Sequence, residues 1–587
     1  MPRKSRRVVV GKNSRGSAVE QGRLRLICVA LFFVLCFGSI TVQLVSMMIA
    51  HDFTMPSFSV ADLIERSETP EELEVSSEPK RLIRADVVDR NGVLLATNLV
   101  THSAFANPKE ISHVEEVAKQ LAVTLKIDQV TLLKRLKRNN SFVWINRHLT
   151  PNEQQAVNSL GIPGVYFLPE ERRVYPYGKT LAHTLGYVGI DNRGLSGLER
   201  RYDDVLTDKE RRDPLALTID VRVQHILRDE MARAVKEYRG VGAAGVVLDV
   251  SSGEVVAISS LPDFDPNQPG NIKDAQRFNR TSLGLYEMGS TFKALTLALA
   301  LDSGLSYKSG YDATKPFKVG RFKISDYHGK KRWLSVPEIF VYSSNIGTAR
   351  MLLDVGIFKQ REFLKTLGLF EAVPIDLKEI AKPILPAKWG EVEAITISYG
   401  HGISVTPLHL VRAIAAMVNG GTLPHLKLVK ESKPQPKRIK RVIEEDTSEL
   451  MRNMFRLVVT HGTGSKANIA GYMVGGKTGT AEKIRTDGRG YSQDKKISSF
   501  VSVFPTNDPK YVVYIMVDEP KPTKKSFGYA TGGWVAAPAV GRVIERMAPI
   551  VGVSPSFDIE LDKSENFWVN TGSKPSKKSK PYFNATC

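Results

Sequence analysis

A serine and a lysine with the spacing of a catalytic pair lie at the start of an apolar helical stretch. The segment YEMGSTFKALTLALALDSG places Ser290 directly after Gly289, and Lys293 follows three residues later. Residues three apart share one face of a helix, so the amine can reach the hydroxyl. A serine hydroxyl needs an adjacent base to become a nucleophile, and a lysine kept neutral by burial or by a second cation can be that base. For an isolated pair, a helix-capping serine beside a surface lysine is the commoner explanation.

A second motif supplies a further hydroxyl and an amide. It is the sequence YSSNIG, residues 342–347, which contains Ser343 and Asn345. Ser343 would relay a proton toward a leaving amine, and the Asn345 amide would hold both the lysine and the backbone of a substrate. By itself the motif is a turn, because Ser and Asn dominate turns.

A third motif, KTG, consists of Lys477, Thr478 and Gly479, and Thr480 follows it. On a strand, its cation and hydroxyls would bind a carboxylate, and its backbone groups would pair with an extended peptide. The same lysine completes the phosphate-loop pattern G-x-x-x-x-G-K-[ST] over residues 471–478. A phosphate loop must open a helix, and the following residues EKIRTDGRG have no apolar helical face. We therefore expect no bound nucleotide.

The N-terminal part of the chain predicts a membrane anchor. Residues 26–50 contain no charged side chain and are long enough to cross a hydrocarbon layer of roughly 30 Å as a helix. Eight cations and one anion precede them, so the positive-inside rule keeps residues 1–25 in the cytoplasm and places the rest outside. A cleaved signal peptide is the alternative, but its apolar core is shorter and ends in an A-x-A-like site.

Charge and cysteine usage narrow the class of protein. Cys28 and Cys36 lie in the predicted anchor and Cys587 is the last residue, so the exported body has no pair placed for a structural disulfide. The net charge of +20 could suggest nucleic acid. An exported chain would instead meet anionic lipid headgroups and carboxylate-bearing wall polymers. We expect no nucleic-acid partner.

Hydrophobic patterning predicts an α+β fold for the rest of the chain. Residues 51–80 read as a linker, and residues 81–235 as a mixed α/β module that opens with an Asn-Gly hairpin at Asp89–Gly92. Residues 236–553 begin with β-rich runs, continue with helices and return to strands. This order predicts one central antiparallel sheet flanked by helices. From residue 554 to residue 587 the composition predicts a disordered tail.

The motifs S-x-x-K, S-x-N and K-T-G, in this order, are a signature of penicillin-binding proteins and class A β-lactamases. Over nearly all of residues 81–545 the chain resembles the class B penicillin-binding proteins, most closely the septal, FtsI type. The family's usual Pro and Gly are replaced by Met288 and Ala85. The segments that carry the resemblance are ADVVDRNGVLLA, ERRVYPYGKTLAHTLGYVG, GLSGLERRYDDVL, LTIDVRVQ, GVVLDVSSGEVVAISSLPDFDPN, SYGHGISVTPLHL and GGWVAAPAVG.

The resemblance implies a peptidoglycan D,D-transpeptidase acting on D-Ala-D-Ala stem peptides, with residues 81–235 as its pedestal or dimerisation domain. Ser290 would attack the penultimate D-Ala carbonyl while Lys293 takes its proton. The backbone N–H groups of Ser290 and Thr480 would form the oxyanion hole. Ser343 and Lys477 would pass a proton to the departing D-Ala. β-Lactams would acylate the same serine and leave slowly.

The resemblance also implies binding groups, partners and a location. Thr478 and Thr480 would hold the carboxylate of the departing D-Ala, beside Gly479. The protein would sit in the bacterial inner membrane at the division septum, as a single-pass protein with its catalytic domain in the periplasm. A SEDS-type membrane glycosyltransferase and other division proteins would be its partners. No metal or other cofactor enters the reaction, and His401, in YGHG, has no second ligand at metal spacing.

Three other functions use the same residues or the same fold. An elongation-type class B penicillin-binding protein would share every motif. A β-lactamase or D,D-carboxypeptidase would give the acyl group to water, but between Asn345 and Lys477 no E-x-x-L-N-like loop supplies a deacylating carboxylate. A non-catalytic β-lactam sensor would carry several membrane spans and a cytoplasmic signalling part, whereas the predicted cytoplasmic part is residues 1–25. A scaffold that keeps the fold and recruits a partner is the other non-catalytic alternative, and a scaffolding role is also compatible with catalysis.

Overall fold

The computed structural model describes residues 84–208, 210, 213–320, 322–431, 440–484, 490–557 and 562–569, together with Leu35 and residues 37–39. The predicted cytoplasmic segment and linker, and almost all of the predicted anchor at residues 26–50, lie outside these residues. None of the helices that the described residues form has the length and apolar character that a membrane crossing requires. The folded part of the chain is the compact unit that begins at Leu82.

The N-terminal module is built on a five-stranded sheet. The strand order is β3-β2-β1-β5, and β4 pairs with β2. Asp89 accepts from the backbone N–H groups of Asn91 and Val93, which closes the predicted Asn-Gly hairpin between β1 and β2. The strands are β1 Val87–Val88, β2 Leu94–Ala106, β3 Val143–Leu149, β4 Val165–Val174 and β5 Leu215–Ala216.

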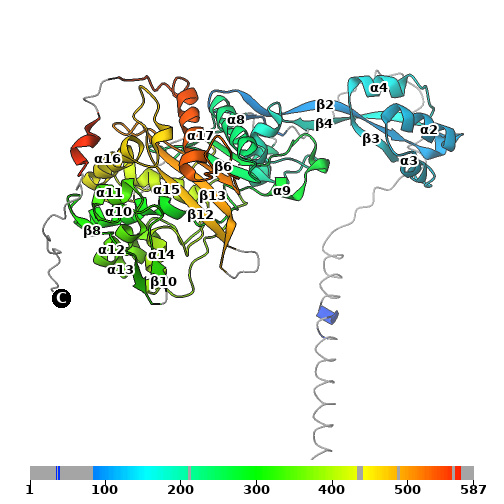
Figure 1. Cartoon of the computed structure of the whole chain (residues 1–587). Helices are drawn as coiled ribbons and strands as arrows, with labels where there is room; N and C mark the ends of the chain where they lie inside the picture. The colour runs from blue at the N-terminus through cyan, green and yellow to red at the C-terminus, as the bar shows by residue number, and fades with distance from the viewer. Residues whose placement is uncertain are drawn as a thin grey trace, which may run out of the picture. The chain divides into compact units, whose positions relative to one another are not determined.

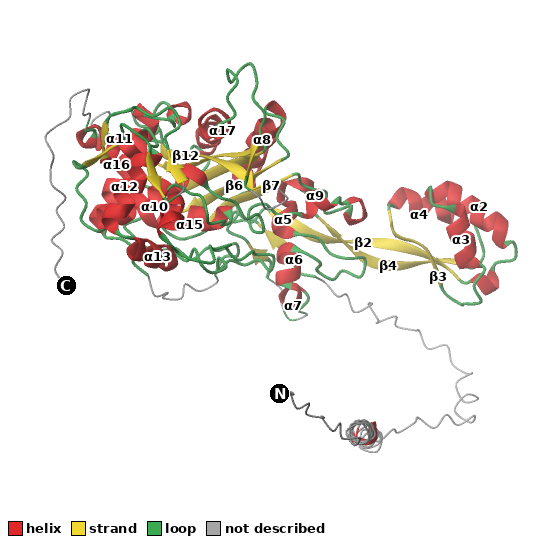
Figure 2. Cartoon of the chain, turned by 60° about the horizontal axis from the view of Figure 1, so that its bottom comes forward, coloured by secondary structure: helices red, strands yellow, loops and turns green. Residues whose placement is uncertain are grey.

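Helices cover the end of this sheet that contains β3. There, apolar residues of β2 and β3 pack against the helices in one hydrophobic core. Two of these helices, α2 and α3, form from the amphipathic segments VEEVAKQLAVTL and QVTLLKRL (Figure 2). The helices of the module are α2 Val114–Leu125, α3 Gln129–Leu136, α4 Pro151–Asn158, α5 Ala182–Leu185, α6 Gly197–Arg201 and α7 Asp203–Leu206. Helix α8, Val221–Glu237, follows them and packs on the sheet of the second part of the structure.

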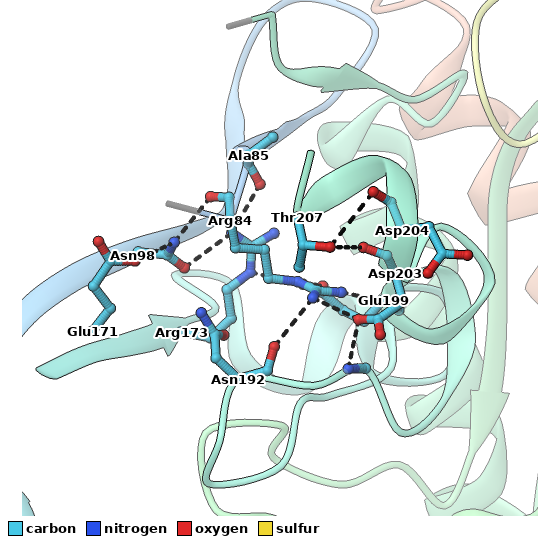
Figure 3. A network of polar contacts seen from close by, with 11 residues as sticks. Arg84, Ala85, Asn98, Glu171, Arg173, Asn192, Glu199, Asp203, Asp204 and Thr207 are labelled. Atoms are coloured by element: carbon cyan, nitrogen blue, oxygen red, sulfur yellow. Dashed lines mark hydrogen bonds and ion pairs between the residues drawn. The ribbon is translucent and has the colours of Figure 1, made fainter. Parts of the chain in front are cut away.

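A buried ion network holds the start of the module against α6 and α7. Glu199 accepts from Arg84 Nε at 2.5 Å and from Arg173 Nε at 2.8 Å, and Arg84 Nη1 lies 2.7 Å from Asp203 Oδ1 (Figure 3). Arg84 also donates to the carbonyl oxygens of Asn192 and Glu199. Buried charges are tolerated only when they are paired and hydrogen-bonded. This network therefore ties distant segments of the module together.

The second part of the structure contains the predicted central antiparallel sheet, with strand order β12-β13-β14-β6-β7. Strand β14 lies at its centre, and successive residues of YVVYIMV alternate between two hydrophobic cores. Because both faces are buried, the strand is a continuous apolar run rather than an alternating one. The strands are β6 Gly242–Asp249, β7 Val255–Leu261, β12 Gly475–Ile484, β13 Tyr491–Phe504 and β14 Tyr511–Asp518.

Helices cover both faces of this sheet, as the α+β prediction requires. Helices α8 and α17 pack side by side on one face, and α15 and α16 lie on the other (Figure 1). The helices are α9 Asp274–Arg277, α10 Lys293–Asp302, α11 Val336–Val341, α12 Asn345–Val355, α13 Ile357–Thr366, α14 Glu391–Ser398, α15 Pro407–Val418, α16 Glu445–His461 and α17 Gly532–Met547.

Short elements complete this part. Two small hairpin-like pairs are β8 Gly310–Asp312 with β11 Trp333–Ser335, and β9 Phe317–Val319 with β10 Phe322–Ile324. Beyond α17, the expectation of a disordered tail is wrong for residues 562–569. They contain the 3-10 helix η8, Lys563–Phe567, which packs on α16 because Arg456 of α16 pairs with Asp562 at 2.7 Å.

Candidate active site

The segment that carries Ser290 is held by close backbone contacts. Ser290 lies in the 3-10 turn η5, Gly289–Phe292, and Lys293 is the first residue of α10. The Gly289 N–H donates to the Gly400 carbonyl at 3.0 Å. Gly289 has φ +54°, and a Cβ there would lie 2.7 Å from the Thr480 carbonyl oxygen. Only glycine allows strand β12 to pass so near the turn, which brings KTG beside the serine.

The Lys293 amine lies between two serine hydroxyls. Its Nζ is 3.1 Å from Ser290 Oγ, 3.0 Å from Ser343 Oγ and 2.6 Å from the Ser343 carbonyl oxygen. The side chain is buried. Loss of solvation lowers the pKa of Lys293 from 10.5 to about 7, although the charge of Asp326 opposes this shift. A large fraction of this lysine is therefore neutral near physiological pH and able to accept a proton.

Lys477 approaches the same Ser343 hydroxyl from strand β12. Its Nζ is 3.0 Å from Ser343 Oγ, and the side chain is completely buried. Burial lowers the pKa of Lys477 well below its usual value, and the charge of Lys293 adds to the shift. One hydroxyl thus lies between two amines, an arrangement through which a proton can pass.

The Ser343–Asn345 motif lies between α11 and α12. Ser343 has φ +57°, a left-handed conformation that costs a non-glycine residue on the order of 1 kcal/mol or more. Ser344 caps α12 by accepting from the Gly347 N–H at 3.0 Å. Asn345 donates to the Ser325 carbonyl at 3.0 Å, so the structure gives its amide a different partner from the expected lysine.

KTG lies on an edge strand, not in a phosphate loop. Strand β12 pairs with β13 on one side, and no described strand pairs with its other side. The Thr478 and Thr463 hydroxyl oxygens are 2.7 Å apart, and Thr480 Oγ1 accepts from the Gly532 N–H at 3.1 Å. The residues after Lys477 continue as a strand, whereas a phosphate loop would open a helix there.

The third residue of KTG is a point of close approach. A Cβ on Gly479 would lie 2.4 Å from Ser499 Oγ and 2.9 Å from the Met288 carbonyl oxygen. Met288, which stands where the family has Pro, is buried, and its Sδ accepts from the Tyr514 hydroxyl at 3.6 Å. The turn before Ser290, the candidate nucleophile, therefore packs directly onto β12.

Sequence reasoning missed Asp326, because no motif surrounds it. Its carboxylate accepts from Ser344 Oγ at 2.7 Å and from the Ile346 N–H at 2.9 Å. It also raises the pKa of Lys293, against the larger effect of burial. Asp326 thus fixes the loop of the second motif and adjusts the basicity of the lysine.

His401 contacts the segment that leads to the candidate nucleophile. Its Nδ1 lies 3.0 Å from Glu287 Oε2, and Glu287 also accepts from the Gly402 N–H at 2.8 Å and from the Tyr491 hydroxyl at 3.1 Å. Glu287 comes three residues before the candidate nucleophile, so these contacts brace that segment. Among the described residues, no group of three or more His, Cys, Asp or Glu side chains is arranged to hold a metal ion.

Comparison with known proteins agrees with this geometry. The model of the penicillin-binding protein transpeptidase domain matches residues 243–545, and that of the penicillin-binding protein dimerisation domain matches residues 80–213. A probable peptidoglycan D,D-transpeptidase FtsI of Caulobacter vibrioides is 42% identical, over 81% of this chain and 82% of its own. The chain belongs to the class B penicillin-binding proteins of the FtsI type.

Two further matches of this penicillin-binding protein have lower identity. The peptidoglycan D,D-transpeptidase FtsI of Escherichia coli is 29% identical, over 83% of this chain and 87% of its own. The crystal structure of a peptidoglycan synthetase from Bifidobacterium adolescentis superimposes with a TM-score of 0.63 at 21% identity. It covers 81% of this chain and 96% of that one, and shows that the two share a fold.

Proposed function

We propose that this penicillin-binding protein is a serine D,D-transpeptidase that cross-links peptidoglycan stem peptides. The single observation that carries the proposal is the position of the Lys293 amine, 3.1 Å from Ser290 Oγ and 3.0 Å from Ser343 Oγ, in a buried site. The family membership and the named relatives supply the substrate class, D-Ala-D-Ala stem peptides.

In the first step the Ser290 hydroxyl attacks the carbonyl of the penultimate D-Ala, and the neutral Lys293 amine accepts its proton. General-base help of this kind contributes roughly 10² to 10⁴ in rate. The backbone N–H groups of Ser290 and Thr480 stabilise the oxyanion, each worth on the order of 10² to 10³. The nearness of η5 to β12 supports this pairing of donors from two elements.

In the second step the peptide bond breaks and the terminal D-Ala leaves as an amine. The proton that it needs is the one that Lys293 took from Ser290, and it passes through the Ser343 hydroxyl, with the Lys477 amine, 3.0 Å from the same oxygen, as a further relay. Thr480 Oγ1 accepts from the Gly532 N–H, so its own O–H remains free to donate to the carboxylate of the leaving residue. Thr478 supplies a second hydroxyl.

An amine from a neighbouring stem peptide then attacks the acyl-enzyme carbonyl and forms the cross-linking amide bond, while the ester bond to Ser290 breaks and the proton of the amine returns through Lys293 to Ser290 Oγ. The outer edge of β12 supports binding of an extended acyl-donor peptide, because an edge strand presents unpaired N–H and C=O groups. Asn345, two residues after Ser343, would contact the same peptide through its amide. β-Lactams acylate Ser290 as analogues of this donor.

The location of the reaction follows from the family and the predicted anchor. We place the protein in the bacterial inner membrane at the division septum, with its catalytic domain in the periplasm. A SEDS-type glycosyltransferase and other division proteins would supply and organise its substrate strands. Depletion in the host bacterium tests this role, because loss of a septal enzyme gives filaments and loss of an elongation enzyme gives spheres.

Covalent labelling tests the chemistry. The full-length protein in detergent is incubated with a fluorescent penicillin, and label gain and loss are followed for wild type and for Ser290→Ala. We expect a long-lived adduct in wild type alone. An adduct that survives Ser290→Ala would refute the serine mechanism, and rapid loss of the label would show a hydrolase instead.

A further inference from the structure

A segment of the chain that follows the matched transpeptidase domain packs against two helices that lead to the candidate active site. The match ends at residue 545, whereas residues 562–569 pack on α16 and α11. At one end Asp562 pairs with Arg456. At the other, the Ser335 hydroxyl donates to the Val569 carbonyl at 2.6 Å. Ser335 is the buried cap of α11, so the segment is fastened to the helix that leads into Ser343.

Trp568 lies between these two attachments and contacts two further aromatic side chains. Its ring stacks on His461, with centroids 4.7 Å apart and planes at 19°. It also meets Tyr342 edge to face, with centroids 6.1 Å apart and planes at 83°. The Lys330 amine also lies near the Tyr342 ring, 4.5 Å from its centroid. Aromatic pairs in these geometries attract beyond simple burial.

Both partners of Trp568 adjoin residues of the site. Tyr342 directly precedes Ser343, which keeps a left-handed backbone conformation. Such a conformation persists only where its surroundings enforce it. His461 ends α16, and two residues later Thr463 contacts Thr478 of KTG. One indole therefore joins the loop of the second motif to the loop that supports the third.

We propose that Trp568 is a positioning residue for the acylation of Ser290. It holds Tyr342 and His461 together, and so sets the separation of the Ser343 hydroxyl from the amines of Lys293 and Lys477. Misplacement of reacting groups by about 1 Å can cost on the order of 10² in rate. Trp568 touches none of the reacting groups itself. The inference rests on the proposed function for its effect on rate, but its effect on the loop is independent of that function.

The kinetic test compares Trp568→Ala with Trp568→Phe in the full-length protein. The acylation rate constant and the dissociation constant are separated by varying the concentration of fluorescent penicillin. We expect Trp568→Ala to lower the acylation rate constant about tenfold with little change in the dissociation constant. We expect Trp568→Phe to keep most of the wild-type acylation rate constant. A chain ending at Leu561 should behave as Trp568→Ala does, and one ending at Asn570 as wild type does.

A second measurement needs no substrate. Hydrogen exchange of the peptide covering residues 342–345 should quicken in Trp568→Ala and not in Trp568→Phe. Unchanged exchange would overturn the proposal whether or not the protein is a transpeptidase. Acylation within twofold of wild type would also overturn it. A melting temperature that is lowered in Trp568→Ala and is not restored in Trp568→Phe would also overturn the proposal, because that result would show a general stabilising role. Failure of the wild-type protein to label would instead count against the proposed function.

Discussion

The Lys293 amine and the Ser290 hydroxyl are 3.1 Å apart, in surroundings that exclude water from the lysine. The contact has two consequences. The amine is near enough to accept the serine proton. Burial lowers the pKa of the amine from 10.5 to about 7, so that part of the lysine population is neutral near pH 7. The local helix geometry gives the first property, and only the packing of other elements over the lysine gives the second.

The acylation rate should depend on the protonation of Lys293. Its protonated form cannot accept the serine proton, so the rate should fall as the pH drops below about 7 and should level off above it. The measurement is the rate of labelling by a fluorescent penicillin between about pH 5 and pH 9. A rate that stays constant down to about pH 5 would show that a carboxylate is the base.

Asp326→Asn should move this pH dependence. The carboxylate raises the pKa of Lys293, so its removal should lower that pKa and shift the acid limb below pH 7. Asn keeps one oxygen, which can still accept from the Ile346 N–H, and its NH2 group can donate to Ser344 Oγ in place of the second carboxylate oxygen. Asp274→Asn, at an exposed carboxylate, is the matched control and should leave the profile in place. A shift of the limb toward higher pH would contradict the electrostatic argument.

Gly479→Ala should impair acylation without unfolding the protein. The added methyl group would lie 2.4 Å from Ser499 Oγ and 2.9 Å from the Met288 carbonyl, so β12 must move away from η5. We expect a loss of roughly 10² in acylation rate, as for a displacement of about 1 Å. Gly270→Ala introduces the same group into open space and should label at the wild-type rate. Equal rates for the two variants would refute the steric explanation.

Glu199→Gln should destabilise the N-terminal module. It removes the carboxylate that Arg84 and Arg173 share, and breaking a buried pair costs about 3 to 5 kcal/mol because the remaining charge is uncompensated. Urea denaturation, monitored by hydrogen exchange within residues 84–208, measures the change in the free energy of unfolding. Asp191→Asn removes an exposed partner of Arg147 and should cost about 1 kcal/mol or less. Similar losses for both would mean that burial of the network contributes nothing.

Several features were predictable because they depend on neighbours in the chain. The i, i+3 pair of Ser290 and Lys293, the Asn-Gly hairpin and the apolar run of β14 all follow from local geometry and patterning. The three motifs in order, with the surrounding segments, identified the family. Asp326 and residues 562–569 were not predictable in this way, because no motif or apolar period marks them.

By itself, then, the sequence determined the family, the α+β class and the residue types of the site, since each is encoded in short stretches. Only the tertiary structure decided that Lys293 and Lys477 meet at one Ser343 hydroxyl, and that burial lowers the pKa of both lysines. It also decided that Trp568 reaches Tyr342. Contacts between distant segments, and the desolvation that they cause, depend on how whole elements pack and leave no local pattern.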